Sequence, residues 1–189
     1  GFSSVSLTNA GSDVILKNAE GRVINAISYT DKWYNDDNKS DGGWSIERVN
    51  PNLFCERENN WRASVANIGG TPGKQNSVIG EKVLAKPFRI TKAFIIDSNK
   101  VQVHFNKSLD SLSLLDSSLF SVNGIVAIKS TPITPFFNSL NLTIGFTFLE
   151  NNTYTISANG LIDCSGGLIS NSMSFEIPDS VLEKEIIIN

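Results

Sequence analysis

His104 is the only histidine in the chain, so a Ser-His-Asp catalytic arrangement would have to use it. It alternates with Val103 and Phe105 in a strand-like segment, and we therefore expect its side chain to point away from the core. No nucleophile-elbow pattern accompanies it. These residues predict a protein that is not an enzyme and that carries no cofactor.

The segment DKWYNDDNKSDGG, residues 31–43, is the most acidic part of the chain and raises the question of calcium. It contains four aspartates, Asp31, Asp36, Asp37 and Asp41. Counted from Asp37, an EF-hand loop requires a glutamate at its twelfth position, where Arg48 stands instead. One histidine and two cysteines are also a poor donor set for zinc. A solvated loop is favoured over a metal site.

The following stretch, residues 42–78, combines tryptophans with Gly, Pro and Asn and has no regular periodicity. Trp44 and Trp61 are large enough to close the open end of a small β-sandwich, with Arg48 and Arg62 tying loop carbonyls together. The alternative is an aromatic platform for a sugar or peptide, for which the candidates are Trp33, Trp44 and Trp61. We favour the architectural role.

The overall composition excludes several classes of partner. The chain has 189 residues, a net charge of −3 and 40% hydrophobic residues, enough for one large domain or two smaller ones. Its Lys and Arg are dispersed and outnumbered by acids, so we expect no nucleic-acid partner. No apolar run approaches the roughly 20 residues that cross a bilayer, so we expect no membrane insertion.

Period-2 alternation predicts β-strands throughout. The clearest strand covers residues 139–150, in which every second residue is large and apolar: Leu140, Leu142, Ile144, Phe146 and Phe148. Residues 100–106, 152–158 and 173–177 alternate in the same way and are separated by turn residues. Only residues 108–120 suggest a short helical turn, between two strands. This pattern is typical of β-sandwiches.

A change in composition marks a domain boundary. The Gly-rich, Trp-containing first part ends near residue 80, and a part without Trp begins at Pro87. We place a first domain at 1–80, a short linker at 81–86, a second domain at 87–178 and a tail at 179–189.

Several ordered motifs resemble known families. Residues 6–29 (SLTNAGSDVILKNAEGRVINAISY), followed by GGWSIERVNP, NNWRAS and GGTPGKQNSV, resemble the C-terminal half of a bacterial lamin tail domain. The second part resembles bacterial Ig-like domains of the S-layer-protein type through KVQVHFNKSLD, NNTYTISANGLID and DCSGGLI. The resemblance implies an all-β fold of two tandem Ig-like β-sandwich domains, the first truncated at its N-terminus.

The resemblance also implies a function and a location. Such modules occur in exported proteins, many from Bacteroidota, so we expect the periplasm, the cell surface or secretion. A non-catalytic role in adhesion, scaffolding or spacing is implied, with an unidentified protein or glycan as partner. The alternatives are an accessory module of a secreted hydrolase or nuclease, and a carbohydrate-binding module.

Two further expectations follow from export and from the chain's last residues. Cys55 and Cys164 form a disulfide in an oxidising compartment, or they remain two separate thiols. The final residues EKEIIIN, 183–189, resemble the opening strand of a further lamin tail domain. We expect this tail to pair with a sheet edge, in its own molecule or by strand addition to a second copy; otherwise it pairs with nothing.

Overall fold

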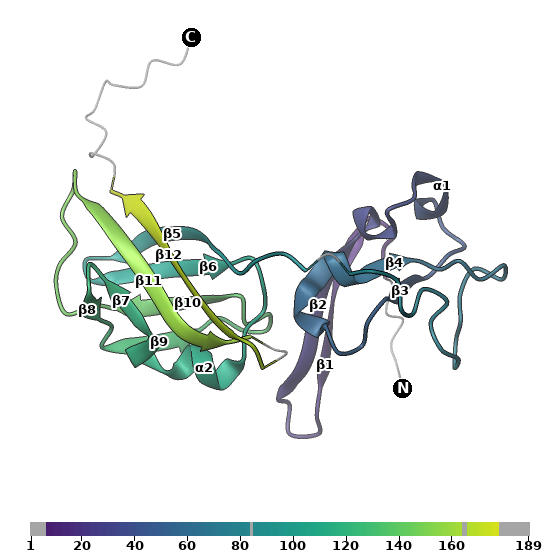
Figure 1. The fold of residues 1–189 in the computed structure, drawn as a ribbon, viewed down its shortest axis with the longest axis horizontal. Coiled ribbons are helices and arrows are strands. Elements are labelled where there is room, and N and C mark those ends of the chain that lie inside the picture. The colour runs from purple at the N-terminus through teal and green to yellow at the C-terminus, as the bar shows by residue number, and fades with distance from the viewer. Residues whose placement is uncertain (1–6, 84, 164–165, 178–189) are drawn as a thin grey trace, which may run out of the picture. The chain divides into compact units, whose positions relative to one another are not determined.

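The computed structural model describes residues 7–83, 85–163 and 166–177, and they form an all-β protein with a few short helices (Figure 1). The chain divides into two compact units, Gly1–Pro87 and Phe88–Asn189. The segment predicted as a linker, residues 81–86, lies at the end of unit 1, and Pro87, which the sequence places in the second domain, also belongs to unit 1. The predicted tail, residues 179–189, lies outside the described residues, and its pairing stays a prediction.

Unit 1 contains two antiparallel strand pairs, β1 with β2 and β3 with β4, joined through short helices. Its elements are β1 (Gly11–Lys17), β2 (Val23–Thr30), the 3₁₀ helix η1 (Asp31–Tyr34), α1 (Asp37–Ser40), β3 (Ile46–Arg48), the 3₁₀ helix η2 (Phe54–Asn60) and β4 (Trp61–Ala63).

The turn between β1 and β2 explains how the first pair forms. The Asn18 side chain accepts a hydrogen bond from the Arg22 amide at 2.8 Å, and Gly21 adopts a φ of +80° that glycine tolerates best. The resulting register sets Val14 opposite Ile27. Because side chains alternate between the two faces of a strand, these apolar residues face the same side of the hairpin.

Unit 2 consists of two four-stranded antiparallel sheets, ordered β5-β6-β10-β9 and β12-β11-β7-β8. Its elements are β5 (Ile90–Asp97), β6 (Lys100–Phe105), α2 (Ser111–Leu115), the 3₁₀ helix η3 (Ser117–Leu119), β7 (Phe120–Val122), β8 (Ile125–Val126), β9 (Lys129–Pro132), β10 (Ser139–Thr143), β11 (Thr153–Ile162) and β12 (Leu168–Glu176).

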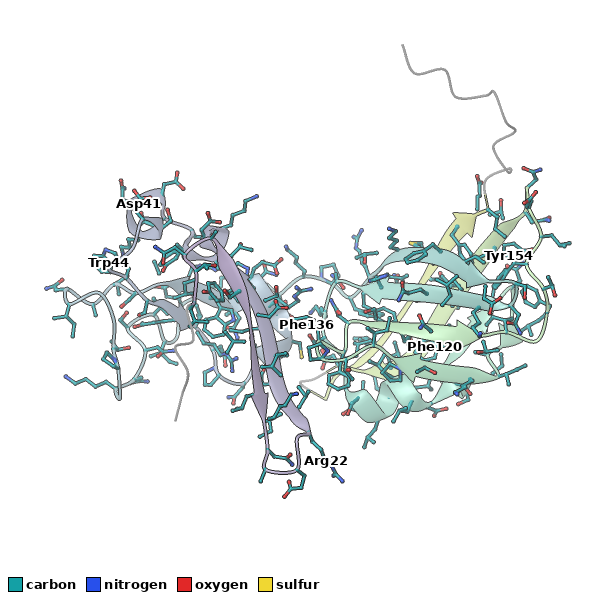
Figure 2. All side chains as sticks on the ribbon, turned by 180° about the vertical axis from the view of Figure 1, so that it is seen from behind. Arg22, Asp41, Trp44, Phe120, Phe136 and Tyr154 are labelled. Atoms are coloured by element: carbon teal, nitrogen blue, oxygen red, sulfur yellow. The ribbon has the colours of Figure 1, made fainter. Side chains whose placement is uncertain are left out.

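The core of unit 2 is made of the alternating apolar residues of both sheets, and the labelled Phe120 and Tyr154 belong to it (Figure 2). The predicted alternation in residues 139–150 is confirmed in its burial: Leu142 and Ile144 are fully buried, whereas Phe146 is only half-buried. The strand itself ends at Thr143. Beyond it the backbone bonds to the β5–β6 turn instead, with the Ile144 amide donating to the Asn99 carbonyl at 2.9 Å.

The helical turn predicted within residues 108–120 is confirmed. Asp110 caps α2 by accepting a hydrogen bond from the Ser113 amide at 2.8 Å, and Asp116 caps η3 in the same way through Ser118. Leu114, within α2, is fully buried. Among the described residues no helix has the length and apolar character needed to cross a membrane.

Candidate functional site

Glu47, in the middle of β3, is a buried carboxylate with only 4% of its surface exposed. Its Oε1 accepts hydrogen bonds from the hydroxyls of Thr71 at 2.7 Å and Ser45 at 3.3 Å. Its Oε2 accepts from the Ser77 amide at 2.6 Å and from the Ser77 hydroxyl at 2.7 Å. Both oxygens are therefore fully used, by donors that lie mostly in the loop after β4.

These hydrogen bonds control the charge of Glu47. Burial raises the pKa of the carboxyl group, but the hydrogen bonds from Thr71, Ser77 and Ser64 together outweigh burial and lower it to about 2. Glu47 is thus ionised at neutral pH, and its bonds are charge-assisted, which makes them stronger than neutral ones. The carboxylate ties the loop of residues 64–80 to β3.

The loop's backbone completes the attachment. The Ser45 amide donates to the Gly69 carbonyl at 2.7 Å, and the Ser64 amide donates to the Ser45 carbonyl at 2.8 Å. Gly69 has a φ of +86°, and a Cβ there would lie 2.0 Å from the Gly43 carbonyl oxygen. Only glycine fits at this approach of two backbones, so the Gly-rich character of the stretch has a direct structural cause.

The two arginines of this region behave differently from each other. Arg62 does bond to backbone carbonyls, but not to the loop carbonyls that the sequence predicts: its Nη1 donates to its near neighbours Trp61 in β4 at 2.7 Å and Asn59 in η2 at 3.3 Å. The same expectation was wrong for Arg48, which makes no such bond within the described residues. Its guanidinium instead lies over the Trp61 ring, 4.9 Å from the ring centre, since cross-strand pairing sets the two residues opposite each other.

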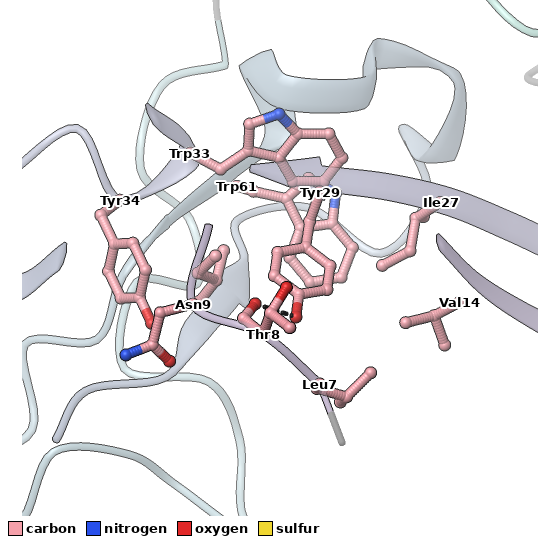
Figure 3. Close-up of a pocket in the computed structure, with 10 residues that line it drawn as sticks. Leu7, Thr8, Asn9, Val14, Ile27, Tyr29, Trp33, Tyr34 and Trp61 are labelled. Carbon is pink, nitrogen blue, oxygen red and sulfur yellow. Dashed lines mark hydrogen bonds between the residues drawn. The ribbon is translucent and has the colours of Figure 1, made fainter. Parts of the chain in front are cut away.

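A groove of about 300 Å³ lies between the two strand pairs of unit 1 (Figure 3). Aromatic and aliphatic side chains line most of it: Tyr29, Trp33, Tyr34, Trp61, Val14 and Ile27. The Tyr29 hydroxyl donates to the Thr8 carbonyl at 2.7 Å. The volume falls at the lower end of the range for small-ligand sites.

The three tryptophans that could face a ligand lie in different surroundings. Trp33 is buried, with its ring centre 5.8 Å from that of Trp61. Trp44 is half-buried, with the Lys39 ammonium 4.4 Å from its ring centre. Trp61 is half-buried and contacts both Trp33 and Arg48. Each indole already has a packing partner, and a ligand-facing role for any of them stays a prediction.

His104 lies on β6, where it alternates with buried neighbours as predicted. Its ring stacks on Phe94, with 5.7 Å between the ring centres. Burial, followed by the nearby charge of Lys92, lowers the pKa of His104 below its usual 6.5. The histidine is therefore mainly neutral at pH 7 and serves in packing.

In the acidic segment, Asp36 caps α1 by accepting a hydrogen bond from the Asn38 amide at 3.1 Å, and it forms an ion pair with Lys39 at 3.8 Å. Nowhere in the described part of the chain do three or more His, Cys, Asp or Glu side chains gather in a way that could hold a metal ion. At least one of the four aspartates thus has a role in local structure.

Of the two cysteines, Cys55 is buried within η2, with 2% of its surface exposed. Cys164 lies outside the described residues. The predicted disulfide between them stays a prediction.

Among known proteins, similarity is found with solved structures of a bacterial S-layer protein. No family model matches the chain, and no curated protein does either. Among solved structures, the N-terminal part of the bacterial S-layer protein SbsC is similar at 21% identity and a TM-score of 0.41. That match covers 49% of this chain and 24% of the SbsC chain. A structure of SbsC domains 1–6 matches at 21% identity and a TM-score of 0.42, covering 50% of this chain and 14% of that one.

The match thus spans a quarter or less of the SbsC chains. The lamin tail resemblance and the assignment to Bacteroidota stay predictions, since no family model matches.

The sequence reading missed Glu47 as the centre of the long loop. Its partners Thr71 and Ser77 are 24 and 30 residues away in the sequence, so no local motif marks them. The only available signal was a glutamate in a strand followed by a hydroxyl-rich loop.

Proposed function

We propose that this chain is a non-catalytic, Ig-like part of a modular protein of the cell envelope or cell surface, in which it acts as a scaffold or spacer. The observation that carries the proposal is the attachment of the loop of residues 64–80 to β3 through Glu47. These hydrogen bonds attach the long loop to β3 at Thr71 and at Ser77. Rigidity in a connecting loop is what a spacer needs, whereas a catalytic loop usually has to move.

Unit 2 supports the same role. Its two sheets enclose a continuous apolar core, and the ends of its short helices are capped by Asp110 and Asp116. A sandwich of this kind holds its two ends at a fixed separation because its interior is closely packed. The motif resemblance to exported Ig-like modules supports the location at the cell surface, in the periplasm or in the secreted fraction.

A replacement experiment in the modular protein tests this function. This segment is exchanged for an unrelated pair of rigid β-sandwiches of similar length, and in parallel for a flexible Gly/Ser linker with the same number of residues. A spacer predicts that surface display and the activity of neighbouring modules survive the first exchange and decline with the second. Loss of function with both replacements would contradict the spacer and favour specific binding.

The aromatic groove of unit 1 favours a second candidate, a module that binds a glycan or another small ligand. Tryptophan fluorescence titrated with a glycan panel tests it, because Trp61 borders the groove and Trp44 does not. A saturable change that is lost in Trp61→Phe and kept in Trp44→Phe would support this candidate.

The other alternative is an accessory module of a secreted hydrolase or nuclease. A catalytic signature elsewhere in the same reading frame would favour that role over the spacer.

A further inference from the structure

Arg48 is held in a fixed position at the end of β3. The β3–β4 register places it directly opposite Trp61, and its guanidinium lies over the indole at 4.9 Å from the ring centre. The Arg48 carbonyl accepts a hydrogen bond from the Asn76 side chain at 2.9 Å, which fixes the backbone at this point as well. A stacked arginine of this kind has lost much of its conformational freedom before any ligand arrives.

This guanidinium has no anionic partner in the described part of the chain. Its Nε is fully buried and makes no hydrogen bond there, and none of the described ion pairs includes Arg48. Burial lowers the pKa of Arg48, yet an arginine remains charged at any physiological pH. The buried Nε is closed to a group from outside, but the guanidinium charge still has no described partner, and an anion at the Nη groups would offset the cost of its partial burial.

Glu47 cannot serve as this acceptor. Its two oxygens already accept hydrogen bonds from Ser45, Thr71 and Ser77. Its position next to Arg48 in the strand also directs the two side chains to opposite faces. The charge of Arg48 is therefore available to a group from outside the chain.

The pocket beside Arg48 can admit such a group. It has a volume of about 380 Å³, and Pro51 and Ile79 form apolar walls next to Trp61 and Arg48. A carboxylate entering it can accept two parallel hydrogen bonds from the two Nη groups of the guanidinium, one of the bidentate arrangements that arginine offers to carboxylates. The apolar walls can contact the aliphatic part of the group that bears it.

We propose that this pocket is a docking site for an acidic side chain, Glu or Asp, of a protein partner. A sugar acid would supply the same carboxylate, but Arg48 lies over the Trp61 ring on which a pyranose would have to stack. An aliphatic side chain needs only the Pro51 and Ile79 walls. This assignment goes beyond a spacer function, because it gives unit 1 a specific point of attachment.

The test uses two blocked peptides, acetyl-Gly-Glu-Gly-amide and acetyl-Gly-Gln-Gly-amide, and the NMR signals of the Arg48 Nε–H and the Trp61 indole. We expect a saturable shift of both signals with the Glu peptide and at least tenfold weaker binding of the Gln peptide. Equal binding of the two peptides would overturn the proposal. This comparison uses the unchanged protein, so it does not depend on whether a variant folds.

Variants then assign the binding to Arg48. Arg48→Met keeps an aliphatic side chain over Trp61 and should reduce binding of the Glu peptide at least tenfold. Arg62→Met is the matched control, because the Arg62 guanidinium already donates to backbone carbonyls, and it should bind as the unchanged protein does. Unaltered binding of the Glu peptide by Arg48→Met would overturn the proposal. In a separate titration of the unchanged protein, glucuronate that shifts the Arg48 signal at a lower concentration than the Glu peptide does would also overturn it.

Discussion

Glu47→Gln tests how much the buried carboxylate stabilises unit 1. The pKa of Glu47 falls from 4.5 to about 2 on folding, and 4.5 − 2 is about 2.5 pKa units. At 1.36 kcal/mol per unit, ionised Glu47 stabilises the folded state by about 3 kcal/mol relative to its protonated form. A glutamine has nearly the same shape as a protonated glutamate. We therefore expect Glu47→Gln to lower the free energy of unfolding by about 3 kcal/mol at pH 7.

The effect has a definite pH dependence. Because the pKa is lowered in the folded state, the stabilisation is fully present above about pH 4.5 and is lost as the pH falls toward 2. The stability difference between the unchanged protein and Glu47→Gln should accordingly shrink from about 3 kcal/mol at pH 7 toward zero near pH 2. Other carboxyl groups titrate in both proteins, and subtracting one curve from the other removes their contribution.

Tryptophan fluorescence provides the assay. All three tryptophans, Trp33, Trp44 and Trp61, belong to unit 1, so denaturant titrations followed by their emission report on this unit and not on unit 2. Urea unfolding at pH 7, 4 and 2.5 gives the required free energies by linear extrapolation. A stability difference that stays constant from pH 7 to pH 2.5 would refute the hydrogen-bonded carboxylate as its cause.

Three other predictions concern unit 2, the cysteines and the chain's last residues. Leu142→Ala removes a fully buried side chain and should lower the unfolding free energy by about 2–5 kcal/mol. Thr143→Ala, on the other face of β10, should lower it by less than about 1 kcal/mol. Equal effects of the two substitutions in calorimetry would contradict the sandwich register. Non-reducing mass spectrometry of the unfolded protein should find no reactive thiol at Cys55 or Cys164 before reductant is added, and two free thiols after oxidative purification would exclude the disulfide. If residues 183–189 add a strand to a second copy, their deletion should convert a dimer or larger oligomer into a monomer in light scattering; a monomer before and after deletion would exclude pairing between molecules.

The sequence was most informative where the cause of structure is local. Alternation of apolar and polar residues places successive side chains on opposite faces of a strand, so the buried positions Leu142 and Ile144 could be predicted without any knowledge of the sheets. The short helix α2 was also predictable, because its cap and its buried leucine lie within a few residues of each other. In both cases every interacting residue is near in the chain or follows a fixed period.

The tertiary structure alone decided what the long loop of unit 1 does. Its tryptophans and glycines pointed to architecture, but the group that organises it, Glu47, became visible only when chain folding brought Thr71 and Ser77 to its two oxygens. Arg48 was misassigned for the same reason: its opposite residue, Trp61, is set by the register of two short strands. Hydrogen bonds and cross-strand contacts depend on distances in space. When two partners are far apart in the chain and no repeating period connects them, no local sequence pattern shows that they will meet.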